Sequence, residues 1–244
     1  MAGWSFPTTF TNFTRRYSKS FASTNRNGSA ASSPQKKSTS IKLYANMISQ
    51  PSRAAAWVLK VKGVEYEFVN IDFNGPFIKS DEFKTWNPNG LVPVIRDGDF
   101  SLFESNAILT YLAEKFGWTD LYPIDIQARA KVNEFLHWHH TNTRLFTMQI
   151  MRPAMTKAMG RASPTDLVFL ENADALIAKE MALLEAFLEK DYIAHTDSPT
   201  VADYTAYLSA WIARMKQIRF HDEVREDLNK VLTSMGMRAE ATQP

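Results

Sequence analysis

Residues 91–103, LVPVIRDGDFSLF, decide the fold of this chain. Two short runs of strand-forming residues, 91–95 and 100–103, lie on either side of the turn-forming pair Asp97-Gly98. An Asp-Gly pair between two such runs is typical of a tight antiparallel hairpin. The stretch therefore predicts two neighbouring strands of a β-sheet.

A proline interrupts the first of these runs. A trans proline at Pro93 would remove a hydrogen bond from the strand ladder, so it fits only an edge strand. We expect instead a cis peptide bond between Val92 and Pro93, a form that is almost confined to bonds preceding proline. Such a bond would turn the Val92 backbone outward, where its N–H and C=O can pair with an extended peptide.

The segments on both sides of the hairpin complete a domain. Upstream, the pattern predicts a strand at 41–44, a helix at 51–62 and a strand at 66–71, which form a βαβ unit with a parallel strand pair. Downstream, apolar residues at helical spacing predict a helix at 104–116. The order β-α-β followed by β-β-α is that of a thioredoxin-like domain, here at residues 41–117.

The rest of the chain has a different pattern. After a linker at 118–125, residues 126–244 contain long helical patterns and almost no strand signals. The run 173–188 is one such pattern, with its apolar residues on one side. We therefore predict an α/β domain followed by an all-helical (all-α) domain.

The first forty residues differ from both domains. They contain six basic and no acidic residues, which leaves 22 basic and 26 acidic residues for 41–244. An amphipathic, Arg- and Ser-rich, acid-free N-terminus is typical of an organelle-targeting segment, and the run 15–18 (RRYS) resembles a mitochondrial processing site. We expect a disordered extension at 1–40 and a mitochondrial location, otherwise plastid or cytoplasmic. An extension without an address and a helix on a membrane surface are the alternatives.

Composition excludes several classes of function. The chain has no cysteine, which removes disulfides, thiolate metal sites and a cysteine nucleophile. Its body is mildly acidic, which argues against nucleic acid as a partner. No stretch approaches the roughly 18 consecutive apolar residues of a membrane span, so we expect none.

Four short motifs occur in order along residues 41–225. They are Leu43-Tyr44 with Ser49-Gln50-Pro51-Ser52-Arg53-Ala54, Asn87-Pro88 with Val92-Pro93, Phe103-Glu104-Ser105-Asn106-Ala107-Ile108, and Pro199-Thr200-Val201-Ala202-Asp203. Together they resemble glutathione transferases of the theta-like, serine-using class. The resemblance implies the glutathione transferase fold, a thioredoxin-like domain followed by a helical one. Within the fourth motif, Thr200 and Asp203 form a capping box whose role is in folding.

The resemblance implies that Ser49 is the catalytic residue. No base lies beside it in a triad-like pattern, so its expected role is to donate a hydrogen bond to the sulfur of glutathione and favour the thiolate. Ser49 would otherwise only cap the helix that follows it. Ser52, one turn further on, is the rival hydroxyl.

The glutathione-binding residues implied by the resemblance are Ser49, Lys79, Val92, Pro93, Glu104 and Ser105. Glu104 and Ser105 open a helix, whose free N–H groups and positive dipole end favour an anion such as the γ-glutamyl carboxylate. The Glu104 carboxylate suits the α-amino group. A plain helix cap is the alternative for this pair.

Two departures from the family pattern concern other positions. Where theta enzymes often have a histidine for the glycyl carboxylate, this chain has Ile78, and the neighbouring Lys79 is the replacement that we expect unless it is simply solvated. After Tyr207 the chain runs almost directly into a Trp-x-x-Arg-Met segment at 211–215, which resembles a deletion in the helical domain.

The second-substrate pocket should lie between the domains. The run 138–144 (WHHTNTR) resembles the theta "W-x-H-T-x-x-R" stretch, which implies that Arg144 approaches the thiolate and the product. A surface arginine is the alternative. His137, His139 and His140 lack a carboxylate or cysteine to complete a metal site, so we predict no metal.

The resemblance as a whole implies an enzyme that joins glutathione to small electrophiles, with peroxidase or dehalogenase activity as further options. It also implies a homodimer, glutathione as co-substrate and no permanently bound cofactor. The alternative is a non-catalytic binding module of the same fold. An active-site cysteine transferase is excluded because the chain has no cysteine.

Overall fold

The computed structural model describes residues 41–187 and 192–206. The targeting segment predicted at 1–40 and the shortened stretch predicted after Tyr207 lie outside the described residues. Within the described part, no helix is long and apolar enough to cross a membrane.

The first half is built on a four-stranded sheet in the order β2-β1-β3-β4. Strand β1 (Ile41–Ala45) pairs in parallel with β2 (Glu67–Asn70) and antiparallel with β3 (Val94–Asp97), which forms the hairpin with β4 (Phe100–Phe103). The predicted parallel pair and hairpin are confirmed.

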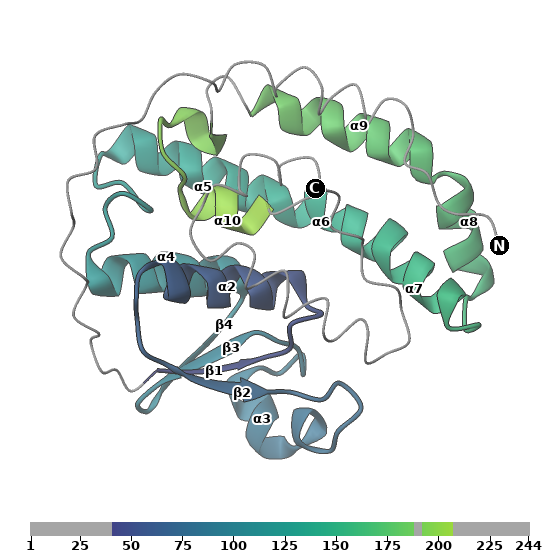
Figure 1. Cartoon of the computed structure of the whole chain (residues 1–244), viewed down its shortest axis with the longest axis horizontal. Coiled ribbons are helices and arrows are strands. Elements are labelled where there is room, and N and C mark those ends of the chain that lie inside the picture. Colours follow the sequence, from purple (N-terminus) through teal and green to yellow (C-terminus); the bar gives the residue numbers. More distant parts are fainter. Residues whose placement is uncertain (1–40, 188–191, 207–244) are drawn as a thin grey trace, which may run out of the picture.

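Helices cover both faces of this sheet, as Figure 1 shows. On one face lie α2 (Gln50–Val61) and α4 (Ser105–Phe116), packed against Leu43 and Ile95 of the sheet. On the other face, the short helices η1 (Phe77–Lys79) and α3 (Asp81–Trp86) enclose a smaller core around Phe83. The order of elements confirms the thioredoxin-like prediction.

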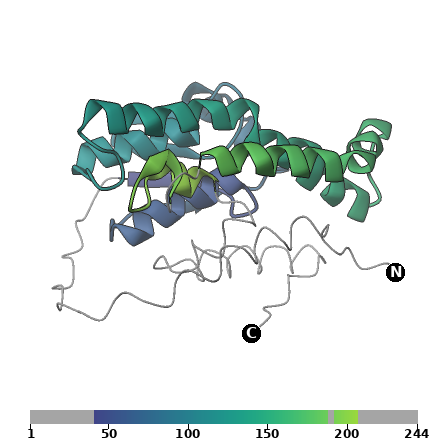
Figure 2. The same ribbon diagram turned by 90° about the horizontal axis from the view of Figure 1, so that it is seen from above.

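In residues 126–187 and 192–206, the described part of the second half, all the regular elements are helical, as predicted. Its elements are α5 (Ile126–Thr141), α6 (Thr143–Phe146), a π-helical turn η2 (Thr147–Met151), α7 (Arg152–Ala158), α8 (Pro164–Glu171), α9 (Ala173–Ala186), η3 (Ile193–His195) and α10 (Val201–Ala206). In Figures 1 and 2 the end of this domain that contains α7 and α8 extends beyond the sheet domain.

The two halves share one hydrophobic core. Buried residues of β1, α2 and α4 belong to the same cluster as buried residues of α5 and α10. At its centre the rings of Trp57 on α2 and Tyr204 on α10 meet edge to face, 4.9 Å apart. Trp57 and Tyr204, two of the largest buried side chains, therefore pack against each other across the boundary between the domains.

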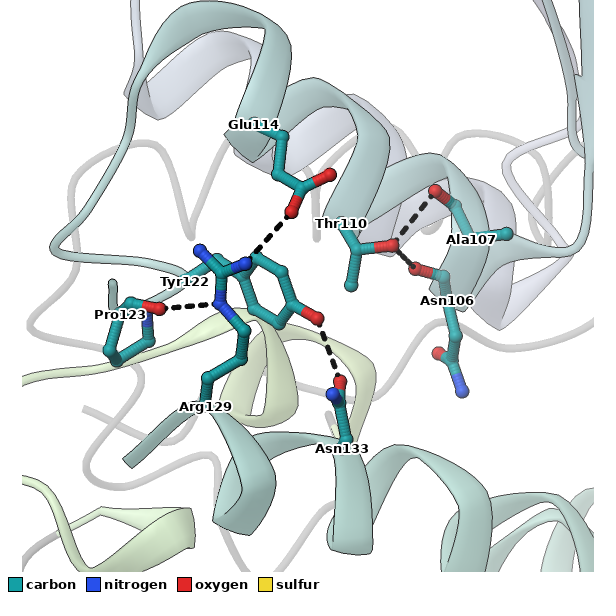
Figure 3. Close-up of polar contacts among 8 residues, drawn as sticks. All are labelled: Asn106, Ala107, Thr110, Glu114, Tyr122, Pro123, Arg129 and Asn133. Carbon is teal, nitrogen blue, oxygen red and sulfur yellow. Dashed lines mark hydrogen bonds and ion pairs between the residues drawn. The ribbon is translucent and has the colours of Figure 1, made fainter. Parts of the chain in front are cut away.

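Polar contacts fix the linker between the halves (Figure 3). Arg129 on α5 donates from Nε to the Pro123 carbonyl, at 2.7 Å, and forms an ion pair of 3.0 Å with Glu114 on α4. The Tyr122 hydroxyl is 3.0 Å from Asn133 Oδ1 on α5. The linker thus lies tied between α4 and α5, and these contacts set how the helical domain sits on the sheet domain.

Candidate functional site

A cavity of about 220 Å³ lies where the start of α2, the loop before β3, the start of α4 and the end of α5 meet. Its walls come from both domains. The lining residues are Gln50, Pro51, Asn87, Asn89, Leu91, Val92, Pro93, Glu104, Ser105, His139, His140 and Arg144.

The peptide bond between Val92 and Pro93 is cis, as predicted. Both residues line the cavity, and strand β3 begins only at Val94. The Val92 backbone therefore lies outside the strand ladder at the cavity wall, where an extended peptide could add to it.

Glu104 has an unusual backbone conformation. Its φ of 69° is positive, which costs free energy in a residue other than glycine and is concentrated at functional sites. Its side chain makes no capping hydrogen bond to α4, so a plain cap does not explain it. Together with Ser105, it brings a carboxylate and the N-terminal N–H groups of a 12-residue helix to the cavity.

Ser49 is the N-cap of α2. Its Oγ accepts a hydrogen bond of 3.4 Å from the Ser52 backbone N–H, so the capping alternative is observed. The contact is long, and it uses a lone pair while leaving the hydroxyl proton for another acceptor. Capping and donation to a ligand are therefore compatible.

A chain of polar contacts connects the walls of the cavity. Gln50 Nε2 donates to the Thr205 carbonyl at 2.6 Å, and the Thr205 hydroxyl donates to Asn106 Oδ1 at 3.0 Å. The Asn106 amide in turn donates to the Leu136 carbonyl at 2.9 Å. These hydrogen bonds connect four helices, α2, α10, α4 and α5. Two of the residues that make them, Asn106 and Thr205, are buried.

The comparisons with known proteins agree with this geometry. Residues 39–114 match the family model of the glutathione S-transferase N-terminal domain. Glutathione S-transferase T1 of Arabidopsis thaliana is 37% identical over 172 residues, which cover 67% of this chain and 68% of that protein.

The chain belongs to the glutathione S-transferase family.

Relatives of the theta class extend the match. Rat glutathione S-transferase theta-2 is 29% identical over 84% of this chain and 92% of its own length. The structure of human glutathione transferase theta-2 in complex with glutathione superposes with a TM-score of 0.70 at 29% identity, covering 84% of this chain and 92% of that one. Arabidopsis glutathione S-transferase T2 is a longer protein, of which the matched region covers 28%. The theta-like assignment and the glutathione S-transferase fold are thereby confirmed.

Within this glutathione S-transferase, five predicted site residues lie together. Val92, Pro93, Glu104, Ser105 and Arg144 all line the cavity. Burial lowers the pKa of Arg144, and the charge of Glu104 opposes that shift. The charges of the half-buried Arg144 guanidinium and the Glu104 carboxylate therefore attract each other at the cavity.

The remaining predicted residues lie outside the lining. Ser49 immediately precedes Gln50 and Pro51, which line the cavity, but is not itself part of the wall. Lys79 is exposed at the end of η1 and is not brought to the cavity. The rival Ser52 is fully buried, and its Oγ has no partner among the described residues, which leaves it out of reach of a ligand.

Sequence reasoning missed several residues of the wall. Three of them, Asn87, Asn89 and Leu91, lie in the loop before the cis-proline. This loop is far in sequence from the helices that form the other walls, so the sequence does not show that they meet. His139 and His140 were considered only as metal ligands, although they lie at the end of α5, four or five residues before Arg144 at the start of α6, and could have been assigned to the cavity with it.

Proposed function

We propose that this theta-like glutathione transferase activates the thiol of glutathione through Ser49 and directs the thiolate at small electrophiles. One observation supports this most directly: the cis-proline loop, the α4 turn and Arg144 converge on one cavity beside the helix that Ser49 caps. Detoxification of reactive compounds is the role that fits such chemistry.

Glutathione would bind by main-chain and charged contacts. The Glu104 carboxylate pairs with the α-amino group, and the N–H groups at Ser105 take up the γ-glutamyl carboxylate at the positive end of α4. The Val92 backbone pairs with the extended middle of the tripeptide. Lys79 supplies the charge for the glycyl carboxylate, which requires the exposed side chain to turn toward the ligand.

The chemical step depends on the thiol pKa. A hydrogen bond from the Ser49 hydroxyl stabilises the thiolate more than the thiol, and each unit of pKa shift requires about 1.4 kcal/mol. One hydrogen bond to a charged group supplies about that much. Positioning of the thiolate beside the electrophile accounts for the rest, and Arg144 stabilises negative charge that develops in the product.

Replacement of Ser49 tests this proposal. In Ser49→Ala of the full chain, we expect glutathione-dependent turnover of aryl halides, alkyl halides or hydroperoxides to fall by about 10- to 100-fold. The pKa of the bound thiol, followed by the ultraviolet absorbance of the thiolate, should rise toward that of free glutathione.

Ser52→Ala is the matched control, one turn along the same helix. Its buried hydroxyl has no partner among the described residues, so turnover should stay near that of the wild type. Equal losses in the two variants would contradict a special role for Ser49. A folded wild type that binds glutathione and turns over none of these substrates would instead indicate a non-catalytic binding module.

Two further parts of the proposal concern the whole chain. The basic segment 1–40 would direct the protein to mitochondria, and a fluorescent fusion of that segment, compared with one carrying Arg15→Ala and Arg16→Ala, tests the address. The resemblance to theta transferases supports a homodimer, for which a monomeric mass in light scattering at micromolar concentration would be the contrary result.

A further inference from the structure

Asn87 ends helix α3 and begins the loop that leads to the cis-proline. The residue is only 3% exposed. Both polar ends of its side chain bind within this loop: Nδ2 donates to the Leu91 carbonyl at 2.8 Å, and Oδ1 accepts from the Asn89 N–H at 3.0 Å. One buried side chain therefore fixes the conformation of the loop 87–91, which contributes Asn89 and Leu91 to the cavity wall.

The main chain of Asn87 is held as firmly as its side chain. Its N–H donates to the Phe83 carbonyl at 3.0 Å, and its carbonyl accepts from the Gly90 N–H at 2.9 Å. Phe83 is fully buried in the smaller core of the sheet domain. Gly90 has a φ of 61°, a left-handed conformation that glycine adopts without strain. Asn87 thus ties the loop to the end of a packed helix, so that the position of Leu91 follows from that of α3.

The contact with the Leu91 carbonyl also sets the direction of the next N–H. Among the described residues only the bond between Val92 and Pro93 is cis, so the peptide unit that joins Leu91 to Val92 is trans. In a planar trans unit the C=O and the following N–H point in opposite directions. Because the Leu91 carbonyl is directed toward the Asn87 amide, the Val92 N–H points away from Asn87.

The Val92 N–H makes no hydrogen bond with any residue in 41–187 or 192–206. Val92 is half-buried and lines the cavity. Backbone N–H groups that are withdrawn from water are nearly always paired in proteins, so this donor indicates a place for the acceptor of a ligand. Its direction decides whether an extended peptide in the cavity can reach it, and the Asn87 side chain fixes that direction.

We propose that Asn87 is a positioning residue for glutathione: by holding the Leu91 carbonyl, it directs the Val92 N–H toward the main-chain carbonyl of the central cysteine of the tripeptide. Ordering the donor before binding reduces the entropy that binding costs. The inference rests on the proposed transferase function and adds the residue that orients its main-chain contact. A role in folding alone would change the amount of folded protein, whereas this role changes the affinity of each folded molecule.

Two variants of the full chain test this role. Asn87→Ser is uncharged and too short to reach the Leu91 carbonyl, and Asn87→Asp keeps the shape of the side chain but replaces the donor by an acceptor. In both we expect the dissociation constant of glutathione, measured by titration calorimetry, to rise about tenfold, the effect of one hydrogen bond. For an electrophile that the wild type turns over, kcat at saturating glutathione should stay within about twofold of the wild type, which is the pattern of a lost binding contact.

Asn172→Asp is the matched control. Asn172 ends α8 and donates from Nδ2 to the Val168 carbonyl at 2.8 Å, but it does not line the cavity, so the dissociation constant should be unchanged. An unchanged constant in the Asn87 variants, an equal rise in Asn172→Asp, or a lower kcat with unchanged affinity would each overturn the assignment. Asn87→Ser, the milder change, decides alone if Asn87→Asp does not fold. If the wild type itself does not bind glutathione, the proposed function fails, whereas equal binding by the wild type and the Asn87 variants removes only this inference.

Discussion

Two helices of the second domain begin with the same four-residue capping pattern, one on the surface and one in the core. At α8, Ser163 Oγ accepts from the Asp166 N–H at 3.2 Å, and Asp166 Oδ2 accepts from the Ser163 N–H at 2.9 Å. At α10, Asp203 Oδ2 accepts from the Thr200 N–H at 2.7 Å. The sequence pattern is the same, but Asp203 is completely buried.

The Asp166 carboxylate accepts one further hydrogen bond, from the Thr156 hydroxyl at 3.2 Å, whereas the Asp203 carboxylate accepts two more. Asp203 also accepts from the Ile193 N–H at 2.9 Å and from the Thr200 hydroxyl at 3.1 Å. The capping-box pattern predicts that the Thr200 hydroxyl accepts a hydrogen bond from the backbone N–H of Asp203. It accepts instead from the backbone N–H of Ala202. This carboxylate therefore joins α10 to the start of η3 as well as capping the helix.

The pKa values of the two carboxyl groups move in opposite directions. Hydrogen bonds from Ser163 lower the pKa of Asp166, because they favour the charged form. Burial raises the pKa of Asp203 to about 7, although hydrogen bonds from Thr200 and Ile193 oppose the rise. One motif can thus contribute to stability in opposite ways across the pH range, depending only on its access to water.

The largest effect is expected from Asp203→Ala. This change leaves the buried N–H groups of Thr200 and Ile193 without an acceptor, and each such donor costs about 1–3 kcal/mol. We expect the free energy of unfolding, measured with urea, to fall by about 3 kcal/mol or more, rather than by the roughly 1 kcal/mol of a lost cap. A loss no greater than that of a cap would mean that the contact with Ile193 contributes little.

A smaller effect is expected from pH. Because the pKa of Asp203 is higher in the folded protein than in the unfolded chain, its contribution to stability is complete at acidic pH and is lost as the pH rises through about 7. In Asp203→Asn this dependence should disappear. The measurement is the difference in unfolding free energy between wild type and variant from pH 4 to 8, and a difference independent of pH would contradict the expectation.

The smallest effect is expected from Asp166→Ala. Asp166 is only half-buried, so water can replace the lost hydrogen bonds, and Tm at neutral pH should fall by less than in Asp203→Ala. The sign with pH is reversed: a lowered pKa gives stability that is present at neutral pH and is lost as the pH falls through the acidic range. Similar shifts of Tm in both variants would show that burial does not separate the two boxes.

The two capping boxes also illustrate what could be predicted from the sequence: local patterns could be, and contacts between distant segments could not. The hairpin and its cis-proline follow from local signals, since Asp97-Gly98 and Val92-Pro93 act within a few residues. Helices η1 and α3 between β2 and β3 were missed, although Ser80 followed by Asp81 and Glu82 is a recognisable helix start. The breaks between α5 and α7 were missed because a continuous helical pattern does not show where the axis bends.

At the site, most of the predicted residues that line the cavity lie in a recognisable motif. Glu104, Ser105 and Arg144 were assigned in this way, whereas the contacts that Asn106 makes with Leu136 and Thr205 depend on which helices meet. The Ile193 contact of Asp203 joins the start of η3 to α10, ten positions further along the chain, and has no sequence pattern of its own. Such tertiary partners become visible only when the elements are placed in space.

The hydrogen bond from Gln50 to the Thr205 carbonyl has a consequence for the order of biosynthesis. It joins positions 155 residues apart, and the shared core around Trp57 is closed by Tyr204 of the same late helix. During translation, the whole sheet domain leaves the ribosome before α10 has been synthesised. The apolar sides of α2 and α4 that pack against α10 therefore stay exposed until then. For this chain, the shared core is completed only after the six residues Val201–Ala206 have been synthesised, and apolar surface that stays exposed until then favours aggregation.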